Sequence, residues 1–143
     1  MDHVAIMKKS WGFIPKILSG EKTIESRWYK NKLAPWGKIQ KSDEVYFKNS
    51  GELVSTQAVV SNYTQYSDLT PKKVEKILDE HYKEIGISKE EKKDFFIKIK
   101  NKKYCILIFI KNPHEIKPFN INKKGFGMMS AWISVDNIDK LKK

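Results

Sequence analysis

The sequence predicts a strand-dominated α+β fold whose strands form a small, partly closed barrel. Most segments either alternate apolar and polar residues or are rich in β-branched and aromatic residues, as half-buried strands are. Turn residues separate these segments at short intervals, which favours antiparallel pairing over a parallel sheet. The length of 143 residues suits one core, so we expect a single domain over 1–143.

Four strands and one helix are expected in the first half of the chain. Alternating or β-branched residues predict the strands, and apolar residues three and four apart predict the helix. Pro15 falls in the first turn of this helix, where proline is tolerated, and Gly20 provides a C-terminal stop. The expected strands are 3–7, 22–29, 43–50 and 52–66, and the expected helix is 11–20.

A helical insertion is expected at about 71–98. Thr70 suits the N-cap of its first helix, and Pro71 suits the first helical position. Ser88 and Glu91 have the spacing of a capping box, so we expect a second helix to follow them.

The strongest strand signal is residues 104–119, which begin with the longest apolar run of the chain. We expect Asn112 and Pro113 to break this strand. Cys105 is the only cysteine, so it forms no internal disulfide, and its apolar neighbours favour a buried position. A short closing strand at 130–136 and a final helical turn complete the expected elements.

The composition favours a soluble, cytoplasmic protein with an anionic partner. A formal charge of +11 attracts polyanions, and phosphate contacts dominate the affinity for nucleic acids. Alternatively, the abundance of lysine, isoleucine and asparagine makes the excess charge a compositional bias. The apolar run at 104–110 is far shorter than the roughly 20 residues that span a bilayer, and the N-terminus does not resemble a signal peptide. No membrane association is expected.

The sequence also predicts neither a metal nor a cofactor. His3, His81 and His114 lie too far apart in the chain for a recognisable metal site, and one cysteine adds little. The chain has no phosphate-loop motif. Among oligomeric states, a monomer is favoured.

Residues 20–27 contain the only arginine among the 28 lysine and arginine residues of the chain. Gly20 ends a helix and turns the chain into a strand, so side chains converge at that rim. Glu25 and Arg27 are expected on the same face of this strand. A guanidinium binds a carboxylate or phosphate through two parallel hydrogen bonds, which an ammonium does not. Arg27 therefore either binds a ligand in this way or pairs with Glu25 and holds the barrel together.

This stretch resembles the signature of the ASCH domain family (ASC-1 homology), whose pattern is Gly-x-Lys-x-x-Glu-x-Arg. The matching residues are Gly20, Lys22, Glu25 and Arg27. The flanking elements follow a similar order, so the resemblance covers about residues 3–134. It implies a β-barrel similar to that of PUA domains, with RNA or a nucleotide bound in a cleft beside the motif.

The family resemblance also implies two possible reactions. Some members are ribonucleases, and one bacterial branch is an amidohydrolase that deacetylates N4-acetylcytidine. The nucleophile proposed for that branch is a threonine three residues after the motif lysine. Glu25 occupies this position here, and Thr23 would face the opposite side of a strand from Lys22. The covalent threonine mechanism therefore does not carry over, whereas a carboxylate at this position can still act as a general base.

A second candidate stretch lies before the closing strand. Lys123 and Lys124 precede a Gly-Phe-Gly turn, where the backbone can approach a ligand closely and the lysines can contact phosphate. Phe126 or Trp132 would stack on a base. Alternatively, the stretch is a hairpin turn in which these two rings and Met128 plug the end of the barrel.

Three functions remain open from the sequence. The leading one is a module that binds RNA or a modified nucleotide, with Lys22 and Arg27 on a phosphate or base edge. Glu25 would orient these two side chains or accept hydrogen bonds from an amino group of the base. The second is a metal-independent ribonuclease or nucleoside amidohydrolase with Lys22 and Glu25 as its acid–base pair. The third is a protein-interaction domain with a compositionally basic surface. The remaining residues expected in the binding site are Lys123, Lys124, Phe126 and Trp132.

Overall fold

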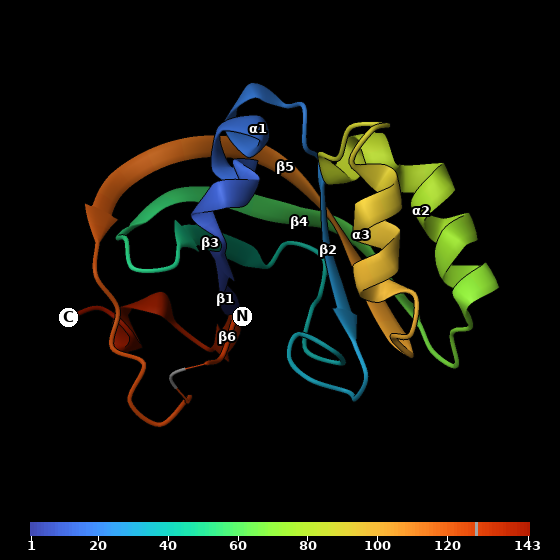
Figure 1. The fold of residues 1–143 in the computed structure, drawn as a ribbon. Helices are drawn as coiled ribbons and strands as arrows, with labels where there is room; N and C mark the ends of the chain where they lie inside the picture. Colours follow the sequence, from blue (N-terminus) through green and yellow to red (C-terminus); the bar gives the residue numbers. More distant parts are fainter. Residues whose placement is uncertain (128) are drawn as a thin grey trace.

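The computed structural model describes residues 1–127 and 129–143 and shows a strand-dominated α+β fold (Figure 1). Six strands of the described residues form one sheet in the order β2-β5-β4-β3-β1-β6, curled into a half-barrel, so the predicted fold class is confirmed. The strands are β1 (Asp2–Met7), β2 (Ile24–Tyr29), β3 (Glu44–Asn49), β4 (Val54–Tyr66), β5 (Tyr104–Phe119) and β6 (Trp132–Val135). The helices are η1 (Lys9–Trp11), α1 (Phe13–Ser19), α2 (Pro71–Ile85), α3 (Lys92–Ile99) and η2 (Ile138–Lys140).

One pair of strands departs from the predicted antiparallel pattern. β1 and β3 run parallel, with His3 opposite Val45 and Ala5 opposite Phe47, whereas the other neighbouring strands pair antiparallel. The chain reaches β3 only after it has passed through α1 and through β2 at the far edge of the sheet. The alternation of apolar and polar residues identifies a strand but not its partner. The sequence pattern therefore could not predict that β1 pairs with β3 or that the two run parallel.

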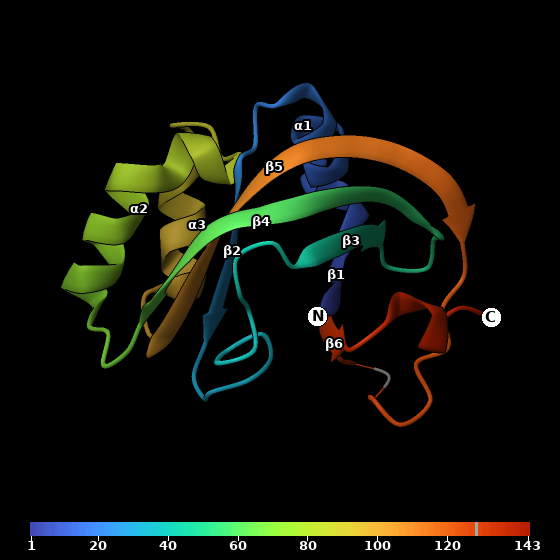
Figure 2. The ribbon, with the colours of Figure 1, turned by 180° about the vertical axis from the view of Figure 1, so that it is seen from behind.

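α2 and α3 form the predicted helical insertion and pack at one end of the sheet, beside β2 (Figures 1 and 2). Thr70 caps α2 as expected, because its side chain accepts a hydrogen bond from the amide of Lys73 at 3.3 Å. Ser88 and Glu91 form the expected capping box before α3, through two reciprocal hydrogen bonds of 3.0 and 3.1 Å. Each cap satisfies exposed amides locally, which is why the sequence located both helix starts.

β5 is one continuous strand, so the predicted break at Asn112 and Pro113 is wrong. The pairing with β4 shifts by one residue between Lys111 and His114, and Asn112 has a φ of 53°. This irregularity is a β-bulge, in which the extra residue makes no ladder hydrogen bond. A bulge tolerates proline for that reason, and the strand continues beyond it.

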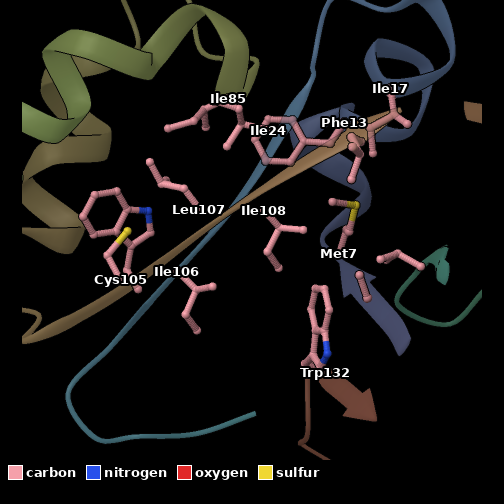
Figure 3. Close-up of a cluster of buried hydrophobic side chains, with 14 of the residues drawn as sticks. Met7, Phe13, Ile17, Ile24, Ile85, Cys105, Ile106, Leu107, Ile108 and Trp132 are labelled. Atoms are coloured by element: carbon pink, nitrogen blue, oxygen red, sulfur yellow. The ribbon is translucent and has the colours of Figure 1, made fainter. Parts of the chain in front are cut away.

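The main hydrophobic core lies within the curl of the sheet. Figure 3 shows Met7 of β1, Ile24 of β2, Ile106 of β5 and Trp132 of β6 in this one cluster. Cys105 is also buried there, as expected, and burial raises the pKa of its thiol well above the ordinary value. A smaller cluster packs the C-terminal segment against β1 and β3. Its buried members are Val4, Tyr46, Val54, Ile121, Ile133, Val135, Ile138 and Leu141.

His3 forms a buried polar network where β1 meets β6. Its Nε2 lies 2.8 Å from Asp43 Oδ2, and its Nδ1 lies 2.8 Å from Ser134 Oγ and 3.1 Å from Trp132 Nε1. An indole N–H only donates, so Nδ1 carries the lone pair and the Nε2 hydrogen is donated to Asp43. Burial lowers the pKa of His3, although the carboxylate of Asp43 opposes this effect. The ring is therefore neutral at pH 7.

Acidification below about pH 6.5 is predicted to destabilise the fold through His3. Its folded pKa lies below the ordinary value of 6.5, so its contribution is fully present above that pH and is lost as the pH falls toward the folded pKa. Thermal unfolding should show a midpoint that decreases from pH 7.5 to 5.5 in the wild type. The decrease should shrink in His3→Gln and persist in His114→Gln, which changes an exposed ring. An unchanged pH dependence in His3→Gln would disprove this assignment.

Candidate functional site

The motif turn begins where α1 ends. Gly20 has a φ of 82° and caps the helix in the left-handed conformation, as the sequence predicted. The amide of Thr23 then donates to Glu84 O of α2 at 2.8 Å. Lys22 consequently lies in the turn before β2, which begins at Ile24, and not within the strand as predicted.

The ammonium of Lys22 is enclosed by protein, and the residue is only 1 % exposed. Its Nζ donates to Ile24 O at 2.7 Å and to Ile85 O at 2.6 Å, and it lies 3.1 Å from Glu25 Oε1. It also lies 4.3 Å from the centre of the Phe13 ring, within cation–π distance. Burial lowers the pKa of Lys22, and the charge of Glu25 opposes this effect. Three acceptors use all three hydrogens of the ammonium, which leaves none for the phosphate that the sequence led us to expect.

Gly86 allows Lys22 to approach the end of α2. Its φ is 94°, and a Cβ at this position would lie 3.2 Å from the Cβ of Lys22 and 3.3 Å from its Cδ. The neighbouring Lys16 donates from its Nζ to Gly86 O at 2.8 Å. Side chains of α1 and of the motif turn thus bind the last carbonyls of α2, and the helical insertion is fixed to the half-barrel.

Glu25 lies between two cations. Its Oε1 faces Lys22, and its Oε2 accepts hydrogen bonds from Arg27 Nε at 3.2 Å and from Arg27 Nη2 at 2.8 Å. Burial alone would raise the pKa of Glu25, but the charges of Lys22 and Arg27 hold that pKa below the ordinary value. The carboxylate is therefore ionised, and both of its oxygens are occupied.

Arg27 also joins the two edges of the sheet. Its Nη1 donates to Ala131 O at 3.1 Å, and its Nη2 lies 3.5 Å from Ile6 O. The guanidinium lies 5.0 Å from the centre of the Trp132 ring. β2 and β6 are the two edges of the sheet, so one side chain connects strands that share no backbone ladder. Arg27 thus makes the pairing with Glu25 that the sequence offered as one of its two roles, and a single ammonium could not make these contacts at once.

A groove lies beside the motif, between β2 and α3. Its main pocket has a volume of about 310 Å³, with Glu25 and Arg27 on the β2 side and Phe95 and Lys98 on the α3 side. A neighbouring hollow of about 220 Å³ continues it past Trp11 and Phe95. We call the two together the β2–α3 groove. The residues that line its main pocket are Trp11, Phe13, Glu25, Ser26, Arg27, Trp28, Tyr29, Phe95, Lys98, Ile99 and Lys102.

Trp132 does not offer a ring face to a ligand, which corrects the predicted stacking role. The residue is 3 % exposed. Its ring packs between the guanidinium of Arg27 and the imidazole of His3, whose centre is 5.5 Å away. The position of Trp132 at the start of β6 was predicted, but its burial depends on partners from β1 and β2 that the local sequence does not reveal.

The other residues expected opposite the motif lie away from the main pocket, whose opposite wall is α3. Lys123 Nζ donates to Ser130 O at 2.9 Å. Lys124 is exposed in a turn, and Phe126 is 41 % exposed there. Met128 lies outside the described residues, so the predicted plug of the barrel end concerns a position on which nothing is stated.

Sequence reasoning missed the α3 side of the groove. Phe95 and Ile99 lie one turn apart and face the groove, and Lys98 and Lys102 flank them. An apolar pair four residues apart, accompanied by lysines at the same spacing, was a signal present in the sequence. It could not be used without knowing that the insertion packs against the motif.

The described residues contain one free thiol, that of the buried Cys105. Within residues 1–127 and 129–143, no group of three or more His, Cys, Asp and Glu side chains is arranged to hold a metal ion. No helix in that part of the chain is long and apolar enough to cross a membrane.

The curled, strand-dominated fold is similar to those of solved structures. The crystal structure of ASCH from Zymomonas mobilis matches it with a TM-score of 0.67 at 16 % sequence identity, over 99 % of this chain and 96 % of that chain. The N-terminal domain of McrB from Staphylothermus marinus matches with a TM-score of 0.60 at 13 % identity, over 97 % and 90 %. The chain therefore has the fold of an ASCH domain, as the motif led us to expect. No family model and no curated protein matches the sequence.

Glu25→Gln is predicted to lower the free energy of unfolding by about 3–5 kcal/mol, because the buried ammonium of Lys22 loses its counter-charge. Urea unfolding followed by circular dichroism measures the loss. The matched control is Glu52→Gln, whose carboxylate pairs with Lys9 at 2.7 Å on the surface. That change should alter stability little, because exposed pairs are weak. Equal losses in the two variants would contradict the proposed role of burial.

Arg27→Lys is predicted to lower the free energy of unfolding by about 1–3 kcal/mol, because hydrogen bonds across the two sheet edges are lost. Hydrogen exchange tests the location of the effect. The amide of Ile6, which donates to Ala131 O at 2.9 Å, should exchange faster in the variant. The amide of Val74 in α2 should keep its protection relative to global unfolding. Uniform changes at both amides would argue against a role at the sheet edges.

Proposed function

We propose that the chain is a nucleic-acid-binding module of the PUA-like class, which takes a base of single-stranded RNA, or a nucleotide, into the β2–α3 groove. One observation carries the proposal: the pocket beside the motif combines aromatic and cationic side chains. Its volume of about 310 Å³ lies at the lower end of the range for small-molecule sites, about 300–1,000 Å³. That size suits a single nucleoside.

Aromatic side chains supply the stacking surface. Trp11 is 42 % exposed at the groove, and its ring centre lies 5.4 Å from that of Phe13. Phe95 is half-buried on the α3 side. A base stacked on such rings gains roughly 1–3 kcal/mol with little preference for its identity. Trp11 is the ring most open to a ligand.

Cationic side chains supply the phosphate contacts. Lys98 is exposed at the groove and Lys102 is half-exposed beside it. Arg27 lies at the inner end, where its charge and that of Lys22 exceed the single charge of Glu25. The groove is thus positive near the motif, in agreement with the formal charge of +11. Lys124 and Phe126, exposed in their turn, would contact a longer RNA outside the pocket.

The fold and the motif support the same class of ligand. The Gly-x-Lys-x-x-Glu-x-Arg pattern resembles that of ASCH domains, for which binding of RNA or a nucleotide beside the motif is implied. The match in fold to an ASCH protein over nearly the whole chain agrees with that resemblance.

The geometry favours binding over acid–base hydrolysis by Lys22 and Glu25. A general acid or base must reach the proton that it transfers. Lys22 Nζ is surrounded by three protein acceptors, and both oxygens of Glu25 are held by cations. Lys22 and Glu25 instead position Arg27 at the inner end of the groove.

Fluorescence anisotropy with labelled single-stranded RNA across a salt series tests the proposal. Trp11→Leu should weaken binding about tenfold or more, through the lost stacking. Lys98→Gln should weaken it and reduce the salt dependence by about one phosphate contact. Lys38→Gln, an exposed lysine away from the groove, is the charge-matched control.

Each outcome has a definite meaning. Equal affinities in wild type, Trp11→Leu and Lys98→Gln would show that the lysine-rich surface binds RNA without the groove. No binding of RNA, nucleosides or nucleotides by the wild type would reject the proposed function and favour a protein-interaction domain. A gel of the bound RNA detects cleavage.

A further inference from the structure

The outer edge of β2 forms one wall of the β2–α3 groove. Among the described strands, β2 comes first in the sheet order and pairs with β5 alone, and α3 lies beside it (Figures 1 and 2). Consecutive residues of the strand, 25–29, all line the main pocket. Successive side chains of a strand point to opposite faces, so consecutive residues adjoin one pocket only if it runs along the strand edge. The backbone of β2 therefore borders the pocket.

Two backbone hydrogen bonds show which residues of β2 bond to β5. In an antiparallel pair, residues that bond the partner strand alternate with residues whose N–H and C=O groups point away. Thr23 O accepts a hydrogen bond from Ile110 N at 3.0 Å. Tyr29 O accepts one from Lys103 N at 2.9 Å. The odd-numbered residues from 23 to 29 therefore face β5.

The even-numbered residues of β2 face the groove. Ile24 O is turned away from β5 and accepts a hydrogen bond from Lys22 Nζ at 2.7 Å. Ser26 and Trp28 follow at the same alternation, so their N–H and C=O groups also point away from β5. Neither a side chain nor a loop of the described residues bonds these backbone groups. They are the free donors and acceptors of an edge strand.

The Ser26 side chain adds a donor at the same place. Its Oγ accepts a hydrogen bond from Trp28 Nε1 at 3.0 Å, because an indole N–H only donates. The hydroxyl hydrogen is left to donate, and no residue within 1–127 and 129–143 accepts it. Ser26 is half-buried and lines the main pocket. Its amide, hydroxyl and carbonyl groups thus offer two donors and one acceptor to a ligand.

A nucleobase complements this arrangement through its Watson–Crick edge. Each of the four bases carries a donor next to an acceptor on that edge, and proteins that bind single-stranded RNA form hydrogen bonds with it. Stacking on Trp11 or Phe95 would use the face of a base and leave its edge free to meet the strand. A peptide strand can also pair with a free edge, but it needs several consecutive positions. Here only Ser26 and Trp28 are open, since Lys22 already binds the carbonyl before them.

We propose that the free edge of β2 recognises the Watson–Crick edge of the bound base, through the backbone and hydroxyl of Ser26 and the backbone of Trp28. This inference rests on the proposed function, because it states how the same groove recognises its ligand. A donor beside an acceptor is common to all four bases, so the groove selects for an unpaired edge and not for one base. It rejects a base-paired strand and a base that is methylated on this edge.

Oligouridylates methylated at different atoms of the base test which edge is recognised. Methylation of N3 removes the donor of the Watson–Crick edge, whereas a methyl group at C5 leaves that edge unchanged. In fluorescence anisotropy, short labelled RNA with N3-methylated bases should bind the wild type at least about tenfold more weakly than unmodified RNA. RNA with C5-methylated bases should bind as unmodified RNA does. Equal affinities for all three would overturn this inference, while a loss of affinity in Trp11→Leu would still support the groove.

Amide hydrogen exchange tests the edge in the wild-type protein. Without RNA, the amides of Ser26 and Trp28 should exchange faster than those of Glu25 and Arg27, which bond β5. Saturation with oligouridylate should slow exchange at Ser26 and Trp28. Slow exchange at all four amides in the free protein would overturn the inference, because the edge would already be bonded. Exchange at Ser26 that RNA binding leaves unchanged would overturn it as well.

Substitutions at Ser26 separate the contributions of its groups. Ser26→Ala removes the hydroxyl and should weaken oligouridylate binding about two- to tenfold. Ser26→Pro also removes the amide hydrogen and should weaken binding further; proline is tolerated on an edge strand where the N–H faces away from the partner. Ser67→Ala, an exposed hydroxyl outside the main pocket, is the matched control.

Wild-type affinity in both Ser26 variants would overturn the inference and leave the proposed function in place. If Ser26→Pro fails to fold, the methylated RNAs and the exchange rates still decide. Failure of the wild type to bind any oligouridylate or nucleotide would reject the proposed function, and this inference with it.

Discussion

The fold depends on keeping the buried ammonium of Lys22 compensated. Its acceptors come from β2 and from the end of α2, so movement of either element would leave the buried ammonium without hydrogen-bond acceptors. Glu25 extends this constraint to Arg27, and Arg27 extends it to the backbone of β1 and to the residue before β6. An uncompensated buried charge costs several kcal/mol. One continuous set of polar contacts therefore fixes both the helical insertion and the closure of the half-barrel.

Elements with local signals could be predicted from the sequence, whereas pairings between distant segments could not. Thr70 and the Ser88–Glu91 box satisfy amides within a few residues, so the pattern alone locates the starts of α2 and α3. The parallel pairing of β1 with β3 and the bulge around Pro113 depend on the partner strand. Turn chemistry and alternation contain no information about that partner.

In the candidate site, too, contacts between residues close in sequence could be predicted, and contacts with distant segments could not. The motif spacing brought Lys22, Glu25 and Arg27 together, and the structure shows them in direct contact. Exposure was harder to predict, since it depends on what packs against each side chain. Trp132 is covered by a histidine and an arginine from other strands, and the wall opposite the motif comes from α3, an insertion whose docking position has no local signature.

The attachment of α2 to the motif turn affects how the β2–α3 groove can recognise a ligand. α2 is held by Lys22 and Lys16, and α3 packs against the main core through Ile99, Phe95 and Phe96. Both walls are thus formed before a ligand arrives, so association requires little loss of conformational entropy. Substitutions on the groove side of α3 would change the ligand that is accepted while the half-barrel remains as it is. Specificity can therefore diverge in the insertion independently of the scaffold.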